Sequence, residues 1–295
     1  NPFGVFVIEP REALSCHYER VANDPRVQHT LTLQVNGEAQ QVSFAPYKTL
    51  LEVLRATFER VDRRLDSSSV EPFVDAYAED LDQLNQRVSA SGEPLEGNLF
   101  YFHHGDYLGL PPHPDRRAKR RMLAAYAQSG RRLLEIGFNA GHSALLCLAA
   151  NPDLQYVGID IGEHAYMRPC YDYLRQRFGE RIEIIEGDSA QVLETLRRRG
   201  SRFDLFHVDG GHSVERAYAD LAGIVALSRD GQTLLLDDVY AKSVRAAANL
   251  LTMQGCLSPV SLLGELTSDQ QQLFRIHRQA SSTLTRLRHW RSSNR

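Results

Sequence analysis

The chain reads LLEIGFNAGHS over residues 133–143, a short apolar strand that passes through Gly137 and Gly141 into a helix-like stretch. Glycines at such a turn let a ligand approach the backbone, and the free N–H groups of the following helix attract polar ligand atoms. A dinucleotide-binding fingerprint would need glycine at 137, 139 and 142, but Asn139 and His142 stand at two of these positions. The turn therefore predicts a cradle for another nucleoside ligand, with an ordinary strand–helix turn as the alternative.

Short apolar strands alternate with amphipathic helices throughout the region after residue 130. We expect strands at 133–137, 156–160, 182–186, 205–209, 233–237, 258–263 and 272–277, and helices at 143–150, 166–178, 190–199, 214–226 and 243–251. Because the gaps are short, the strands must run mostly parallel, with helices on both faces of one sheet. The predicted fold class is α/β, with a doubly wound, mostly parallel, seven-stranded sheet and a smaller α+β N-terminal region.

The region before residue 115 has a weaker, mixed pattern. Residues 29–45 alternate around Asn36-Gly37, which is typical of a type I′ hairpin. Helical spacing follows at 49–65 and at 70–88, where three serines at 67–69 offer an N-cap, and 89–98 has loop composition. We predict an N-terminal region at 1–115, the main domain at 116–280 and a polar, Arg-rich tail at 281–295. The N-terminal region has two candidate roles, as an acceptor pocket and as an oligomer interface.

Two further segments carry charge or aromatic rings. The run RRAKRR at 116–121 opens a helix expected to reach Gln128, and we interpret it as a solvated helix face rather than a nucleic-acid patch. The aromatic stretch 99–107 also contains His103, His104 and Asp106. It is read as packing with polar turns, with a lid over the ligand and a second metal site as less favoured alternatives.

Composition excludes several classes of protein. The apolar fraction of 42% and charged fraction of 24% are those of a globular chain, and a net charge of −3 argues against a dedicated nucleic-acid binder. No apolar run is long enough to span a membrane. The four cysteines form no C-x-x-C pair, so neither a zinc site nor a disulfide framework is indicated. We expect a cytoplasmic protein without nucleic-acid or membrane partners.

Acidic residues stand at the ends of the first three predicted strands. Glu135 lies two residues before Gly137, Asp160 ends the second strand, and Asp188 follows the third strand and precedes Ser189. A carboxylate at the end of the second strand can accept hydrogen bonds from ribose hydroxyls. Helix capping is the simpler explanation for Asp160 or Asp188 alone, but three acidic strand ends in succession favour a nucleoside site.

These residues resemble motif I and the acidic positions that follow it in the class I S-adenosylmethionine-dependent methyltransferases. The resemblance implies S-adenosylmethionine as the cofactor, with Asp160 at the ribose and Asp188 near the adenine. The implied cofactor-binding residues are Glu135, Gly137, Asn139, Gly141, Ser143, Asp160, Asp188, Ser189 and Asp209.

Three more carboxylates follow neighbouring central strands. The fourth strand leads into VDGGHS at 208–213 and the fifth into LLDDVY at 235–240, so Asp209, Asp237 and Asp238 are expected to converge at the carboxyl edge of the sheet. Like charges clustered without compensation are costly, and a hard divalent cation, Mg²⁺ above all, is the natural compensation. The alternatives are a helix cap for Asp238 and a solvated Asp209.

The two motifs together resemble the metal-dependent O-methyltransferases of antibiotic sugar tailoring, of the macrocin and mycinamicin type, over residues 131–278. The resemblance implies that Asp209, Asp237 and Asp238 hold Mg²⁺ and that His212 is the general base, with Asp209 beside it in catalysis. Capping of the next helix is an equal alternative for His212. His207, two residues before Asp209, is expected to be a core residue.

The leading hypothesis is an O-methyltransferase, Mg²⁺-dependent, that acts on a small hydroxylated molecule such as a sugar or a natural-product intermediate. A metal-independent N- or O-methyltransferase, a non-catalytic S-adenosylmethionine-binding subunit and an unrelated reaction on the same fold stay open. The expected partner is a small-molecule acceptor, and a homo-oligomer is compatible with the N-terminal region.

Overall fold

The computed structural model describes residues 29–35, 38–44, 76–97, 99–101, 107–108, 111–260 and 270–278. Several expectations fall outside this range: the helix at 49–65, the serine cap at 67–69, the candidate lid residues His103, His104 and Asp106, and the tail at 281–295. None of the described helices is long and apolar enough to cross a lipid bilayer.

The predicted hairpin is confirmed. Strand β1 (His29–Val35) pairs antiparallel with β2 (Glu38–Phe44), and Val35 opposite Glu38 closes the register around the two-residue turn. A two-residue connection of the Asn-Gly type has the backbone twist that joins such strands.

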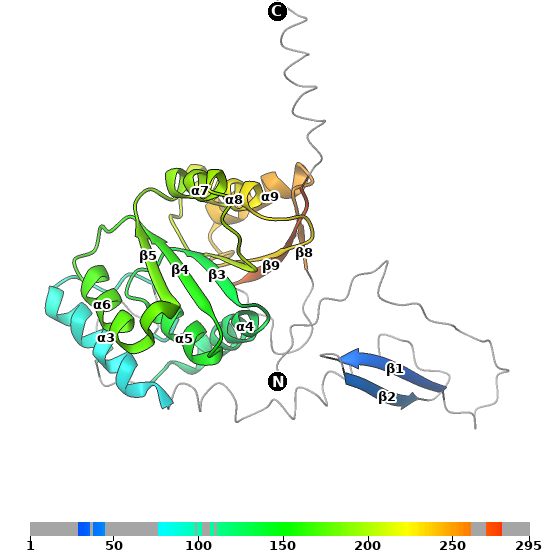
Figure 1. Ribbon diagram of the computed structural model, residues 1–295, viewed down its shortest axis with the longest axis horizontal. Coiled ribbons are helices and arrows are strands. Elements are labelled where there is room, and N and C mark those ends of the chain that lie inside the picture. Colours follow the sequence, from blue (N-terminus) through cyan, green and yellow to red (C-terminus); the bar gives the residue numbers. More distant parts are fainter. Residues whose placement is uncertain are drawn as a thin grey trace, which may run out of the picture.

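The main sheet has seven strands in the order β5-β4-β3-β6-β7-β9-β8 (Figure 1). The first five in this order are parallel, whereas β9 is antiparallel to both of its neighbours. Their bounds are β3 (Arg132–Ile136), β4 (Gln155–Asp160), β5 (Ile182–Glu186), β6 (Leu205–Val208), β7 (Thr233–Leu236), β8 (Leu257–Pro259) and β9 (Gln272–Ile276). This confirms the predicted doubly wound α/β fold, in which ligands bind where the strand order reverses, here between β3 and β6.

Helices cover both faces of the sheet (Figure 1). Alternate strand residues point to opposite faces, so Leu133 and Tyr156 belong to one hydrophobic core and Leu134 and Val157 to the other. The first core is closed by α3 (Ala78–Ser91), α4 (Arg117–Gln128), α5 (His142–Ala150) and α6 (Met167–Phe178), and the second by α7 (Ser189–Arg198), α8 (Val214–Leu227) and α9 (Lys242–Met253). Short 3₁₀ turns, η1 (Pro114–Arg116) and η2 (Gly179–Arg181), precede α4 and β5.

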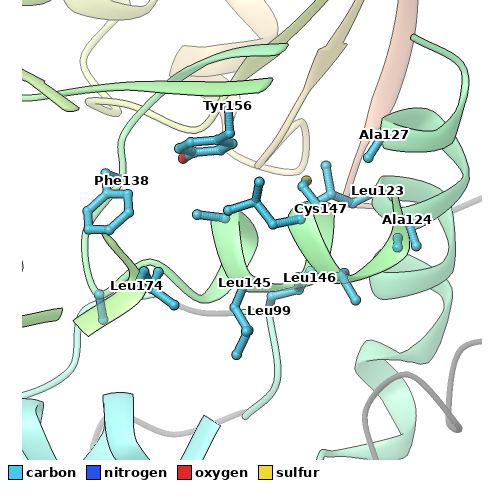
Figure 2. Close-up of a cluster of buried hydrophobic side chains, with 14 of the residues drawn as sticks. Leu99, Leu123, Ala124, Ala127, Phe138, Leu145, Leu146, Cys147, Tyr156 and Leu174 are labelled. Atoms are coloured by element: carbon cyan, nitrogen blue, oxygen red, sulfur yellow. The ribbon is translucent and has the colours of Figure 1, made fainter. Parts of the chain in front are cut away.

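Helix α5 lies in the middle of the first core. All of its residues except Ser143 are buried, as expected of a helix that is apolar on every side. Figure 2 shows Tyr156 of the sheet on one side of it and Leu99 on the other. Leu99 and the α3 side chains therefore share one core with the main domain. The domain boundary at residue 115 stays a prediction, but the core is continuous across it.

Residues 70–75 of the predicted helix lie outside the described residues, and helix α3 ends later than the sequence indicates. It continues to Ser91, into the predicted loop, and ends at Gly92, whose φ of 75° is the left-handed cap that glycine favours. Because the serines at 89 and 91 fit a helix end as well as a loop, composition alone places this boundary poorly.

Candidate functional site

A cavity of about 840 Å³ opens at the carboxyl edge of the parallel strands. The strands that supply it are in register: Ile136 at the end of β3 lies beside Ile159 of β4 and Val208 of β6, which in turn lies beside Leu236 of β7. Ten of the predicted site residues line this cavity: Gly137, Asn139, Ser143, Asp160, Asp188, Ser189, Asp209, His212, Asp237 and Asp238. Their assigned roles stay predictions, but the structure brings the residues together.

The glycine turn after β3 is held in place by Asp160. One oxygen of the Asp160 carboxylate accepts a hydrogen bond from the Asn139 N–H and the other from the Gly162 N–H, both at 2.8 Å. Asn139 itself has a φ of 52°, a left-handed conformation that asparagine tolerates better than most residues. Asp160 does not cap α6, whose N-cap is Tyr166. The carboxylate therefore fixes the turn and faces the cavity.

Gly137 is required by close backbone packing. It has a φ of 93°, and a Cβ atom there would lie 2.0 Å from the Asp209 carbonyl oxygen. The backbones after β3 and β6 can approach each other only because this side chain is absent. Gly141, by contrast, lies beneath the turn against Phe138 and does not line the cavity.

Glu135 lies outside the cavity and supports it from below. It is fully buried, and its carboxylate accepts hydrogen bonds from the Ser143 and Tyr156 hydroxyls and pairs with Nδ1 of His207. Its oxygens are thus engaged with the protein. As placed, Glu135 orients Ser143 and His207 rather than reaching a ligand.

At the end of β5, Asp188 caps a helix and a second carboxyl group, that of Asp220, lies beside Ser189. Asp188 accepts a hydrogen bond from the Gln191 N–H at 3.2 Å and so caps α7, the alternative considered for it. The Ser189 hydroxyl donates to Asp220, a buried residue of α8 that also lines the cavity. Burial raises the pKa of Asp220 to about 6. Asp220 is not predictable from the sequence, because a single acidic residue within an amphipathic helix belongs to no motif.

The basic run at 116–121 is not a solvated face, so that interpretation was wrong. Lys119, Arg120 and Arg121 are all buried. The Lys119 Nζ lies 2.8 Å from Oδ2 of Asp237, and the Arg120 guanidinium donates to the His113 carbonyl oxygen. The run looked solvated because its partners are distant in the sequence.

Both carboxylate oxygens of Asp237 accept hydrogen bonds from the protein. Besides Lys119, Oδ2 accepts from the Gln271 side chain at 3.2 Å, and Oδ1 accepts from the Asp238 N–H at 2.7 Å. Burial alone would raise the pKa of Asp237, but Lys119 and His207 outweigh it and hold the pKa below its usual range. Asp237 is therefore a buried, ionised carboxylate with protein donors on both oxygens.

Asp209 is the contrasting carboxylate. It lines the cavity, and among the described residues no donor is hydrogen-bonded to its carboxylate. Burial and the neighbouring Asp237 raise its pKa to about 7, against the opposing effect of Lys119. Asp209 is thus the carboxyl group at this end of the cavity that is left to contact a ligand.

His212 and Asp238 form a pair at the cavity wall. Nε2 of His212 lies 2.7 Å from Oδ2 of Asp238, and the His212 side chain is 58% exposed. The hydrogen bond to Asp238 raises the pKa of His212. The capping alternatives are excluded for both residues, because Ser213 caps α8 and Ala241 is the N-cap of α9.

His207 is buried, as expected, and the carboxylates around it favour its protonated form. Burial lowers its pKa, yet the carboxylates of Asp237 and Glu135 outweigh this and raise the pKa to about 10. Atoms of His207, Asp209 and Asp237 that could ligate a metal all lie within 4.8 Å of one another. Asp238, the third predicted metal ligand, is not in this group.

Residues that precede the main sheet cover the opposite end of the cavity. Pro94, Glu96 and Leu99 line it together with His164 of the loop after β4. His164 joins the two segments, since Nδ1 lies 3.0 Å from Glu93 and Nε2 lies 3.5 Å from Glu96. No residue pattern predicts this contact between segments about 70 residues apart.

A comparison with protein families finds a match for the part of the chain that carries this site. Residues 134–239, which include both the glycine turn and the carboxylates after β6 and β7, match a family model described as a methyltransferase domain. This segment is a methyltransferase domain. A comparison with curated proteins finds no match for the chain.

Solved structures of the same fold agree with the methyltransferase domain. Cofactor-bound Rv0187 from MTB has a TM-score of 0.51 and 21% sequence identity, over 74% of this chain and 97% of that one. The O-methyltransferase TomG from Streptomyces achromogenes, in complex with SAM, has a TM-score of 0.50 and 18% identity, over 78% of this chain and 100% of that one. At these identities the likeness shows the fold.

Proposed function

We propose that this chain is an S-adenosylmethionine-dependent O-methyltransferase that acts on a small hydroxylated molecule, such as a sugar or a natural-product intermediate. The observation that carries the proposal is that the glycine turn with Asp160 and the Asp209–His212 end line one and the same cavity. A donor and an acceptor bound there would meet. The Streptomyces achromogenes O-methyltransferase, whose structure holds SAM, supports this choice of donor.

The residues at the donor end suit S-adenosylmethionine. Asp160 presents a carboxylate that ribose hydroxyls can approach, and Ser189 at the start of α7 and Asp220 of α8 line the same cavity. When bound, the donor supplies a methyl group already activated on a sulfonium. The remaining task of the chain is to hold an acceptor oxygen in line, about 3 Å from that methyl group.

Asp209 and His212 are the residues assigned to the acceptor. Asp209 can accept a hydrogen bond from the acceptor hydroxyl and orient it, because its carboxylate is not used elsewhere. His212 takes the hydroxyl proton on Nδ1, while its Nε2–H stays hydrogen-bonded to Asp238, which holds the ring at the cavity wall. Transfer of the methyl group to the acceptor oxygen would leave S-adenosylhomocysteine as the second product, and Asp238 would stabilise the imidazolium of His212.

The expectation that the enzyme depends on Mg²⁺ rested on three clustered carboxylates with no cation nearby to balance their charge. Asp237 already has a lysine and two N–H donors, and Asp238 is paired with His212. The set Asp209, Asp237 and Asp238 therefore does not fit an open Mg²⁺ site as arranged here. Magnesium dependence stays a prediction, and the metal-independent alternative is the form that we propose.

The proposed partners are a small-molecule acceptor and neither nucleic acid nor membrane. A cytoplasmic location belongs to the same proposal, supported by free thiols at Cys147, Cys170 and Cys256. A homo-oligomer through the N-terminal region stays a prediction.

Two measurements test the proposal. Calorimetry should detect micromolar binding of S-adenosylmethionine, and a coupled assay of S-adenosylhomocysteine release should show turnover with a panel of sugars, catechols and hydroxy acids. Asp209→Asn should retain donor binding and lose turnover. Donor binding without turnover on any acceptor would favour the non-catalytic subunit, and no donor binding would overturn the proposal.

A further inference from the structure

We infer that the ammonium group of Lys119 is the resident cation of the acceptor end, standing where a divalent ion would otherwise neutralise the carboxylates. Building on the proposed function, this makes Lys119 a positioning residue that locks Asp237 and leaves Asp209 for the acceptor. It also means that methyl transfer needs no added metal.

The position of Lys119 is set by the helix that carries it. Lys119, Leu123 and Tyr126 follow the i, i+4, i+7 spacing of one helix face, and all three are buried. The Tyr126 hydroxyl donates to the Thr233 carbonyl oxygen at 2.8 Å and accepts from the Phe206 N–H at 3.1 Å. Tyr126 thus fastens α4 to β7 and β6, the strands that lead to Asp237 and Asp209.

The contacts of Lys119 leave little room for a metal ion. Its Nζ is 2.8 Å from Oδ2 of Asp237, and the two side chains are only 7% and 1% exposed. An ion on Oδ2 of Asp237 would have to displace this ammonium or the Gln271 amide, and an ion on Oδ1 would share that oxygen with the Asp238 N–H. A divalent ion beside a lysine that stays charged would also meet repulsion at short range in a poorly solvated site.

Charge compensation explains why the lysine is needed. Asp209 and Asp237 are close neighbours, and two carboxylates at such a distance repel each other unless a cation lies between or beside them. Lys119 supplies that charge from within the fold. Without it, three carboxylates, Asp209, Asp237 and Glu135, would surround the buried ring of His207, and this oxygen-rich pocket would be net negative, of the kind that divalent ions prefer.

The experiment is to measure Mn²⁺ binding by electron paramagnetic resonance, with turnover in excess EDTA in parallel. The variants are Lys119→Met and Lys119→Gln, and the matched control is Lys242→Met, which removes an exposed lysine at the start of α9. We expect wild type and Lys242→Met to bind no Mn²⁺ in the micromolar range and to keep full turnover in EDTA. The Lys119 variants should bind Mn²⁺ at least tenfold more tightly than wild type.

Thermal melting and donor binding identify any variant that fails to fold, and Lys119→Arg, which keeps a cation, then serves as the second test and should stay free of Mn²⁺. Wild-type Mn²⁺ binding that Asp209→Asn abolishes would overturn the inference. So would loss of turnover in EDTA that Mg²⁺ restores, or absence of Mn²⁺ binding in folded Lys119→Met. Because Mn²⁺ binding is read without an acceptor, failure of the proposed function is seen separately, as absence of turnover.

Discussion

Nε2 of His212 lies 2.7 Å from Oδ2 of Asp238, and this pair joins the loop after β6 to the loop after β7 at the cavity wall. Asp238 stands there with a φ of 55°, a conformation that is unfavourable for most residues. The backbone thus adopts a strained conformation at the point where the carboxylate meets the imidazole. Strain of this kind is concentrated at functional sites.

The pair predicts the direction of a pH effect. His212 must be neutral to accept a proton, and its hydrogen bond to Asp238 raises its pKa above the ordinary 6.5. Activity should therefore rise with pH, with a midpoint above 6.5. Asp238→Asn weakens the stabilisation of the imidazolium and should move this midpoint to lower pH in a profile of log(kcat/KM). An unmoved midpoint would argue that His212 is not the titrating base.

Removal of the base itself gives a second prediction. His212→Gln should lower kcat by roughly 10²- to 10⁴-fold, the usual contribution of a general base. Donor binding, measured by calorimetry, should change little, because His212 belongs to the acceptor end. A comparable loss of donor affinity would instead assign His212 to the donor site.

Asp160 is expected to control donor affinity. Asp160→Ala removes the acceptor for the Asn139 and Gly162 N–H groups and the carboxylate offered to ribose. Hydrogen bonds to a charged group contribute about 1.5–3 kcal/mol, so the Kd of S-adenosylmethionine should rise by roughly 10- to 100-fold. Asp153→Ala, at an exposed residue before β4, is the matched control and should leave the Kd unchanged.

Gly137→Ala tests the close approach of two backbones. Its Cβ would lie 2.0 Å from the Asp209 carbonyl oxygen, so the free energy of unfolding should fall by more than about 2 kcal/mol. Gly231→Ala is the control, because Gly231 also has a positive φ of 80° but no atom within 4 Å of the added Cβ. The free energy of unfolding of Gly231→Ala, measured in urea, should fall by only about 1 kcal/mol. Equal losses would show that steric contact with Asp209 is unimportant.

His142 predicts sensitivity of the fold to acid. Burial lowers its pKa to about 4, and Nε2 lies 3.0 Å from the Asn85 side-chain oxygen. Above pH 6.5 the residue is neutral in both states. Between pH 6.5 and 4 the unfolded chain binds a proton that the folded chain does not, so stability falls as pH falls. Between pH 7 and pH 4 the free energy of unfolding of the wild type should fall by up to about 3 kcal/mol more than that of His142→Gln. Urea unfolding at each pH measures this difference.

Much of the fold follows from the sequence because its signals are local. Short apolar runs that end in Gly137, Asp160 and Asp209 mark both the strands and the edge at which they meet, and the structure confirms those strands within one or two residues. The hairpin at β1 and β2 follows equally from its alternation and its Asn-Gly turn. Periodicity determines these features without knowledge of distant contacts.

The features that the sequence does not predict are contacts between side chains that are far apart in the chain. Lys119 and Asp237 are 118 positions apart, and neither residue alone predicts that the other is its ion-pair partner. The charge run therefore looked like a solvent-facing helix, and the carboxylates looked uncompensated. Both interpretations lacked the same contact, because the lysine on α4 is the partner of the carboxylate that follows β7. Asp220 and the His164 contact with Glu93 were missed for the same reason.

Part of the cavity wall comes from the chain ahead of the methyltransferase domain, through Pro94, Glu96 and Leu99. Residues 134–239, the segment that matches the family model, therefore do not include the complete cavity wall. Grafting this segment into another protein, or exchanging it between relatives, would leave the donor end without one of its walls. The transferable unit begins at α3, so chimaeras designed to alter acceptor choice should exchange residues from about Ala78 onward together with the domain.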